Sequence, residues 1–306
     1  MLRKMVILPA LLALIASACA PDAPASSSAQ ISLTDGLDRI VTLEKPAQRI
    51  ISLAPSNTEI LFAIGAGQQV IGRDELSDYP ETVLTLKSVG GSMGQYSTET
   101  ILALEPDLVL AAELNPPELV KTLEDLDLTV YYLENPLTLE ELYSNIDSVA
   151  QLTGRQSEAE ALIQSLKDRV TAVDEKIASA DTHPTVFYEL DSTDPSKPWT
   201  AGPGSFIDLL VQRAGGQNIG SVLGSEWAQI SLEELVVTDP EMILLGDAMW
   251  GVTADALRAR PGWDILSAVQ NNRMYPFDDN LVSRPGPRLV DGLEQLAKLL
   301  HPELYE

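Results

Sequence analysis

One short pattern occurs twice in the chain, and this duplication constrains the fold more than any other feature. STETILALEPDLVL occupies residues 97–110, and SLEELVVTDPEMIL occupies residues 231–244. The two copies align at one constant offset, with Ser97 meeting Ser231. Each copy is typical of a helix with a serine N-cap, then a turn of Pro and an acidic residue, then an apolar strand. The repeat therefore predicts an α/β protein with two similar lobes.

The N-terminus is expected to be a targeting signal. A basic pair precedes an apolar run at residues 5–15, which is too short to span a bilayer, and small residues lead to Cys19. We predict a lipoprotein-type signal peptide over residues 1–19 with Cys19 as the lipidated residue, and an ordinary secretory peptide is the alternative. Residues 20–30 are rich in Ala, Ser and Pro and predict a flexible tether. The body of the protein is then extracytoplasmic and anchored to a membrane by lipid.

Charge and side-chain inventory exclude several classes of function. The net charge of −25 repels nucleic acid, whose recognition needs basic patches. Cys19 is the only cysteine, so the body has no disulfide and no thiolate metal site. His183 and His301 are the only histidines, which disfavours a transition-metal site built on imidazoles. We expect no resident metal, no cofactor and no nucleic-acid partner.

The remaining sequence divides into two lobes and a connecting helix. The first lobe covers residues 31–153 and opens with a hairpin at residues 31–43, which alternates around an Asp-Gly turn. The connecting helix covers residues 155–180, and the second lobe covers residues 184–306. We predict three-layer lobes with mostly parallel sheets.

The connecting helix has one continuous apolar face. Ser157 and Glu160 fit a capping box at its start, as Thr138 and Glu141 do for the helix before it. Apolar residues follow at spacings of three and four, namely Ala159, Leu162, Ile163, Leu166, Val170, Val173 and Ile177. A helix this long between two similar lobes is expected to act as a strut.

Polar residues follow the first predicted parallel strand, residues 49–53. Ser56 and Asn57 come next, before a predicted helix at residues 58–66. Because ligands gather at the carboxyl ends of parallel strands, both are candidates for ligand contact, and helix capping is the equally weighted alternative.

A glycine-rich segment suggests an enzyme as a remote alternative. Residues 90–94 fit the G-x-S-x-G pattern of an α/β hydrolase, with Ser92 as nucleophile. That pattern needs a long strand before the serine and a helix directly after it. Only Ser88 and Val89 precede the segment, and three residues separate it from the next predicted helix, so we expect no enzymatic activity.

Several motifs together resemble the solute-binding proteins of ABC importers for iron-siderophores, haem and cobalamin, and the cobalamin-binding member most closely. They occur in the family's order as RIISLAPSNTEILFAIGAG, VIGRDELSDYP, the repeat, WTAGPGSFIDLLVQRAGGQNIG and SRPGPRLVDGLEQLAKLL. The resemblance covers nearly everything from Arg49 onward. It implies a class III periplasmic-binding-protein fold: two α/β lobes joined by one long helix, with the ligand between them and little lobe movement.

The resemblance also implies a role for the repeated glutamates. In the family, one exposed Glu on each lobe docks onto arginines of the permease, and the matching positions are Glu99 and Glu233. Charge-assisted bonds to arginine would give such docking its register. The alternative is that each Glu only offsets the dipole of its helix.

The resemblance implies a corrinoid ligand, with cobalamin the first candidate. Its flat faces and amide rim call for aromatic and hydrogen-bonding side chains. The candidates are Ser56, Asn57, Tyr79, Gln95, Tyr96, Trp199, Trp227, Asn280 and Arg284. Leu76 and Met93 stand where the best-known cobalamin binder has aromatics, which leaves another corrinoid, haem or a ferric siderophore open. An anionic siderophore would favour Arg284 and Arg288, and haem would need a Tyr or His ligand to iron.

Overall fold

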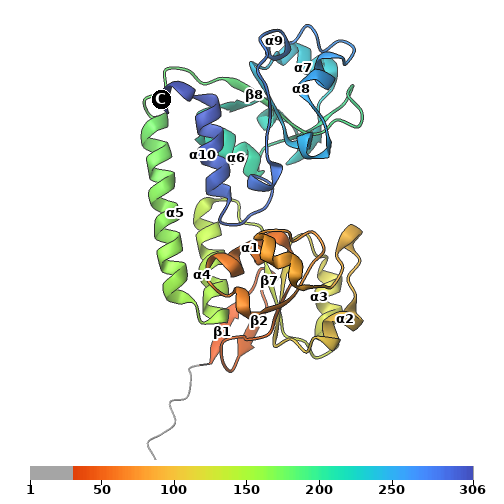
Figure 1. The fold of residues 1–306 in the computed structure, drawn as a ribbon, viewed down its shortest axis with the longest axis vertical. Coiled ribbons are helices and arrows are strands. Elements are labelled where there is room, and N and C mark those ends of the chain that lie inside the picture. The colour runs from red at the N-terminus through yellow and green to blue at the C-terminus, as the bar shows by residue number, and fades with distance from the viewer. Residues whose placement is uncertain (1–29, 306) are drawn as a thin grey trace, which may run out of the picture.

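The computed structural model describes residues 30–305, so the predicted signal peptide, Cys19 and all but the last residue of the tether lie outside the described residues. Two α/β lobes are stacked along the long axis of the molecule, and one long helix, α5, runs beside both of them (Figure 1). The predicted fold class is therefore confirmed. Within residues 30–305 no helix is long and apolar enough to cross a bilayer.

The N-terminal lobe is built on a parallel sheet with strand order β5-β4-β3-β6-β7. Its central strands are buried on both faces, which explains their continuous apolar sequence. The antiparallel hairpin of β1 and β2 precedes the sheet. The elements are β1 (Ile31–Thr34), β2 (Ile40–Leu43), β3 (Ile50–Ser52), α1 (Pro55–Ala63), β4 (Val70–Arg73), β5 (Lys87–Ser88), α2 (Thr98–Ala103), β6 (Leu108–Ala112), α3 (Pro117–Glu124), β7 (Val130–Leu133) and α4 (Leu139–Thr153).

The C-terminal lobe has a mixed sheet with strand order β11-β9-β8-β12-β13, and β10 also pairs with β8. The pairs of β8, β12 and β13 are parallel, whereas β9 runs antiparallel to β8 and to β11. The elements are β8 (Thr185–Asp191), β9 (Trp199–Ala201), α6 (Phe206–Arg213), β10 (Gln217–Asn218), β11 (Trp227–Gln229), α7 (Leu232–Thr238), β12 (Met242–Leu245), α8 (Ala254–Arg258), α9 (Ser267–Gln270), β13 (Met274–Pro276) and α10 (Leu289–Leu300).

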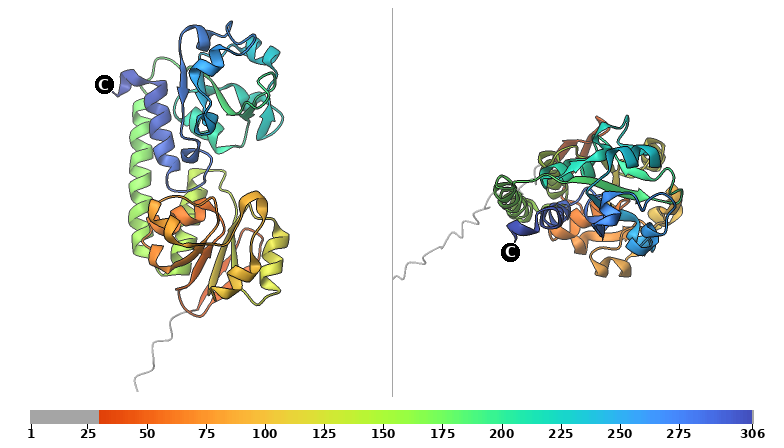
Figure 2. Two further views of the ribbon diagram at one scale, coloured as in Figure 1. Left: turned by 45° about the vertical axis from the view of Figure 1, so that its right-hand side comes forward. Right: turned by 90° about the horizontal axis from the view of Figure 1, so that it is seen from above.

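Helix α5 (Gln156–Ile177) joins the cores of the two lobes. It packs against α4 of the first lobe and α10 of the second, and Figure 2 shows α5 and α10 side by side from two directions. The predicted apolar face is confirmed, since its residues belong to one core cluster that spans both lobes. Arg169 of α5 bonds Asp291 and Glu294 of α10 at 2.5–2.8 Å, which fixes the strut against the second lobe.

Both copies of the repeat fold alike. The Ser97 and Ser231 side chains accept hydrogen bonds from backbone amides at the third helical position of α2 and α7, so the predicted serine caps are confirmed. The predicted capping box at Ser157 is wrong: α5 begins at Gln156, and its N-cap residue, Arg155, makes no side-chain cap bond. Arg155 follows Gly154, whose positive φ ends α4 and turns the chain directly into α5.

Candidate functional site

The carboxyl ends of the two sheets face each other across the gap between the lobes. Asp78 follows β4 of the first lobe, and Arg284 follows β13 of the second. The Asp78 carboxylate accepts a hydrogen bond of 2.5 Å from the Arg284 guanidinium. Strand ends of parallel sheets are where α/β proteins place ligands, so this interlobe region is the candidate site.

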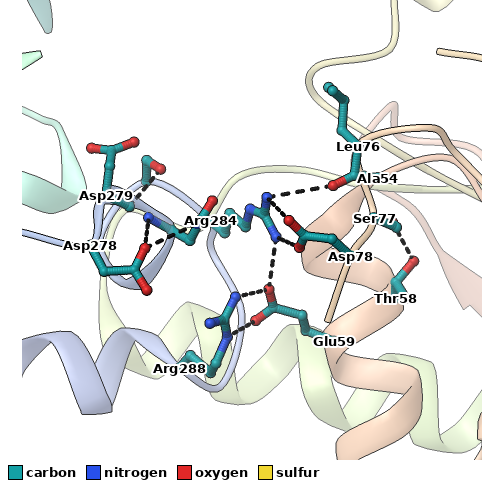
Figure 3. A network of polar contacts seen from close by, with 12 residues as sticks. Ala54, Thr58, Glu59, Leu76, Ser77, Asp78, Asp278, Asp279, Arg284 and Arg288 are labelled. Atoms are coloured by element: carbon teal, nitrogen blue, oxygen red, sulfur yellow. Dashed lines mark hydrogen bonds and ion pairs between the residues drawn. The ribbon is translucent and has the colours of Figure 1, made fainter. Parts of the chain in front are cut away.

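Four charged side chains form an interlobe ion cluster, which we define as Glu59, Asp78, Arg284 and Arg288 (Figure 3). Glu59, on α1, has a side chain only 2% exposed and accepts bonds of 2.6 and 2.9 Å from Arg288. Arg284 lies 3.5 Å from the same carboxylate. The Arg288 guanidinium also stacks over the Tyr79 ring, 4.1 Å from its centroid. The cluster therefore joins the lobes by charge and by packing.

Charge in this cluster is balanced within the protein. Burial alone would raise the pKa of Asp78, but hydrogen bonds and charge from Arg284, together with the charge of Arg288, hold that pKa below its ordinary value. Asp78 therefore stays ionised, as the partner of Arg284. Two carboxylates face two guanidiniums, so the predicted anion-binding arginines are already paired before any ligand arrives.

A small interlobe pocket of about 60 Å³ lies next to this cluster. Both lobes line it, and among the predicted residues it contains Trp227. Its other lining residues are Glu113, Asn135, Pro136, Leu137, Gly204, Phe206, Glu226, Val282, Ser283 and Pro285. Burial, together with the charge of Glu113, raises the pKa of Glu226. The pocket is thus acidic, with apolar and amide groups beside its one indole.

The two tryptophans predicted to contact ligand share one face of a β-ribbon. Trp199 begins β9 and Trp227 begins β11, and in the antiparallel register Trp227 is opposite Ala201 while Gln229 is opposite Trp199. Residues opposite each other, and residues two apart on one strand, point to the same face. The side chains are 42% and 45% exposed, respectively, so both indoles present a free surface.

Tyr96 and its neighbour Gln95 belong to a loop of the N-terminal lobe. The Tyr96 hydroxyl donates to the Leu53 carbonyl at 3.0 Å and accepts from the Asn115 amide at 2.7 Å. Burial, with a smaller contribution from the charge of Asp74, raises the pKa of Tyr96 to about 12. Gln95 is exposed. The hydroxyl of Tyr96 therefore has a structural role at the end of β3.

Ser56 and Asn57 lie in the first turn of α1, which begins three residues earlier than predicted. The alternative of capping is wrong, because the N-cap residue is Ala54 and makes no side-chain cap bond. Both residues are buried, and the Asn57 amide donates to the Ala111 carbonyl at 3.0 Å. Asn280 is half-buried and donates to Asp278 at 3.0 Å. The fold itself thus uses the amides of Asn57 and Asn280.

Ser92 is not placed as a hydrolase nucleophile. It lies in a single 3-10 turn, Ser92–Gly94, and α2 does not begin until Thr98. The two histidines belong to the other lobe, where their ring centroids are 6.3 Å apart and His183 contacts the Gly215 carbonyl. The strand–serine–helix geometry of a nucleophile elbow is absent from this segment, so the hydrolase alternative has no support.

Glu99 and Glu233 occupy the second helical position of α2 and α7, one on each lobe, as Figure 1 allows the reader to follow. Both carboxylates are exposed, and neither makes a hydrogen bond or an ion pair with any residue in 30–305. In α7 the capping box is completed by Glu234, which bonds back to Ser231. Glu233 therefore has no partner among residues 30–305, whereas the carboxylate of its neighbour Glu234 caps α7.

Sequence reasoning missed Glu59, Glu113 and Glu226. Glu113 directly follows β6, and its position after a buried strand was a usable signal. Glu59 sits inside a helix and meets Arg288 across 229 positions of sequence, a separation that leaves no local pattern.

Comparison with known proteins places this geometry among transport proteins. The profile of a family described as periplasmic binding protein matches residues 50–281. An uncharacterized ABC transporter substrate-binding lipoprotein of Bacillus subtilis, YvrC, is 32% identical over 281 residues, which is 90% of this chain and 87% of that protein. A vitamin B12-binding protein of Vibrio cholerae is 31% identical over 258 residues, covering 83% of this chain and 90% of its own length.

Solved structures agree with the sequence comparisons. The periplasmic vitamin B12-binding protein BtuF of Vibrio cholerae superposes with a TM-score of 0.72 at 29% identity, covering 85% of this chain and 99% of that one. The periplasmic heme-binding protein RhuT of Roseiflexus superposes with a TM-score of 0.76 at 28% identity, covering 84% and 99%.

Proposed function

The chain belongs to the periplasmic binding protein family, as an extracytoplasmic solute-binding protein of an ABC importer, and from this premise we propose that it captures a corrinoid, cobalamin first, between its lobes. The observation that carries the proposal is the interlobe pocket, which combines the indole of Trp227 with carboxylates and an amide and offers no free cation. A corrinoid has broad apolar faces and a rim of amides, which suit an aromatic platform and acceptor oxygens.

Charge disfavours an anionic siderophore as the ligand. Glu113 and Glu226 both line the pocket, and burial, with a further contribution from the charge of Glu113, raises the pKa of Glu226. Arg284 and Arg288, which would attract an anion, are bonded to Asp78 and Glu59. An anion would have to displace a carboxylate before it could be held.

Haem is the second candidate, because RhuT shares the fold at a TM-score of 0.76. Haem iron needs an axial ligand from the protein, for which Tyr and His are suitable. The Tyr96 hydroxyl is engaged by Leu53 and Asn115, and its raised pKa disfavours the tyrosinate form. Tyr79 is the exposed alternative, although its ring is covered on one side by Arg288. These contacts favour a corrinoid over haem.

Calorimetric titration with cyanocobalamin, haemin and a ferric hydroxamate siderophore tests the proposal. We expect binding heat from cyanocobalamin alone. Trp227→Ala should weaken that binding about tenfold or more, because a large aromatic anchor commonly contributes 2 kcal/mol or more. Ile265→Ala, which truncates another exposed apolar side chain away from the pocket, serves as the control. Binding heat from haemin and none from cyanocobalamin would show that the ligand is haem and not a corrinoid.

We propose further that Glu99 and Glu233 dock the protein onto the permease and that lipid on Cys19 holds it at the membrane. The free, exposed state of both carboxylates supports docking, since arginine partners could bond them without displacing an internal contact. The similarity to a substrate-binding lipoprotein supports the anchor. Metabolic labelling with a fatty acid should mark the wild-type chain, and Cys19→Ala should lose the label. A labelled Cys19→Ala chain would contradict the anchor.

A further inference from the structure

One buried carboxylate of the C-terminal lobe has unused acceptor capacity. Asp247 lies two residues after the end of β12, in the short 3-10 helix Gly246–Trp250, and is 3% exposed. Its Oδ2 accepts a bond of 2.6 Å from the Ser192 hydroxyl, whereas its buried Oδ1 accepts none from any residue in 30–305. A carboxylate can accept about four hydrogen bonds, and a buried polar atom without a partner is unfavourable. The unused oxygen therefore calls for an external donor.

The neighbouring cation does not supply that donor. The guanidinium of Arg260 donates to both oxygens of Glu189, at 2.6 and 3.0 Å, and to the Ser192 hydroxyl at 2.6 Å. Ser192 in turn donates to Asp247. Arg260 thus makes no direct hydrogen bond to Asp247 and is linked to it only through the Ser192 hydroxyl. The Asp247 carboxylate can therefore still accept a hydrogen bond from a ligand group.

Asp247 lines an open hollow of about 400 Å³ at the carboxyl ends of β8 and β12. Its other walls are Leu190, Asp191, Ser192, Thr193, Trp250 and Val252. The Trp250 side chain is 79% exposed, so its indole is available to a ligand. Because Asp247 is itself one of the lining residues, a donor group that enters the hollow can approach its carboxylate.

The hollow is continuous in the sheet with the tryptophan ribbon. Asp191 of β8 lies opposite Trp199 of β9, and Trp199 shares its face with Trp227 of the interlobe pocket. The strands run in the order β11-β9-β8-β12, so three spacings of about 4.8 Å separate the first from the last. A ligand as broad as a corrinoid, lying on the tryptophans, can therefore reach Asp247 with its rim.

We propose that the hollow around Asp247 is a subsite for hydrogen-bond donors at the rim of the transported ligand, and that in a corrinoid the group bound there is a primary amide. This inference rests on the proposed function. An amide N–H donates to the carboxylate in a charge-assisted bond, while Trp250 packs on the carbon chain that carries the amide. The same charge rejects a carboxylate at that position, so the subsite selects amide over acid.

A paired titration tests this selection. Wild-type protein is titrated with cyanocobalamin and with each of its monocarboxylate isomers, in which one rim amide has been hydrolysed. At least one isomer should bind ten or more times more weakly than cyanocobalamin. In Asp247→Asn that discrimination should fall to less than threefold. Asp255→Asn removes the same charge from an exposed position on α8 and should discriminate as the wild type does.

Trp250→Ala provides a second test of the subsite in case Asp247→Asn fails to fold, because an exposed indole can be removed without opening the core. We expect it to weaken cyanocobalamin binding several-fold with an unchanged melting temperature. The subsite is refuted if wild-type protein binds every isomer as tightly as cyanocobalamin. It is also refuted if Trp250→Ala binds cyanocobalamin as the wild type does and a folded Asp247→Asn still discriminates between the isomers as the wild type does. Failure of wild-type protein to bind cyanocobalamin at all would instead overturn the proposed function, and the subsite with it.

Discussion

Replacement of Glu59 by Gln should measure how strongly the interlobe ion cluster holds the lobes together. The change keeps the shape of a side chain that is 2% exposed but removes the charge facing Arg288 and Arg284. Removing one partner of a buried ion pair typically costs about 3 to 5 kcal/mol, because the other charge is left without compensation. Since both guanidiniums are 15% exposed and can gain some hydration, we expect about 3 kcal/mol.

Thermal unfolding is the assay. At about 2 to 4 °C per kcal/mol, Glu59→Gln should lower the melting temperature by roughly 10 °C. Asp125→Asn breaks an exposed pair with Lys121 on α3 and should change it by little more than about 1 °C. The double variant Glu59→Gln/Arg288→Gln should be less destabilised than the two single changes added together, by at least about 1 kcal/mol. Additive losses, or a Glu59→Gln protein that melts like wild type, would refute the coupling.

Three further outcomes follow from other contacts. The double variant Glu99→Arg/Glu233→Arg should lose cellular uptake of labelled cobalamin while calorimetric binding is retained; retained uptake would refute docking. Burial would raise the pKa of Asp78, but Arg284 lowers it. Their pair therefore stabilises the fold fully above the ordinary Asp value of about 3.9, and this contribution is lost as pH falls through the lowered folded-state pKa. Asp78→Asn should therefore lower the melting temperature at neutral pH but hardly once the pH is below the folded-state pKa of Asp78, and an equal loss in both ranges would contradict this. Ser231→Ala should cost about 1 kcal/mol in urea unfolding through the lost α7 cap; no loss would argue against it.

Much of the architecture could be predicted because it repeats or alternates. The duplicated pattern predicted two lobes, and the apolar spacing along α5 predicted which face joins them. Misses occurred where local patterns compete. The strand Trp199–Ala201 was not predicted, and it forms because β8 and β11 provide hydrogen-bonding partners on both sides. A three-residue strand has too few positions to show alternation.

The candidate site was less predictable than the fold. Trp227 could be singled out because an aromatic residue beside polar loop residues is typical of a binding surface. The pairing of Arg284 and Arg288 could not, because it depends on Glu59 and Asp78, which lie more than 200 positions away and belong to the other lobe. The sequence therefore identified the arginines without showing that their charges are already neutralised.

Helix α5 also bears on how this protein could diversify. Its 22 residues, at about 1.5 Å each, make a frame roughly 33 Å long that holds both lobes by their cores. The cleft, by contrast, is lined by loops and a short ribbon at the strand ends. Substitutions in those loops can change the ligand while Glu99 and Glu233 keep their separation. With the docking proposed for Glu99 and Glu233, a lineage built on this frame can thus acquire new cargo without having to re-evolve its fit to the importer.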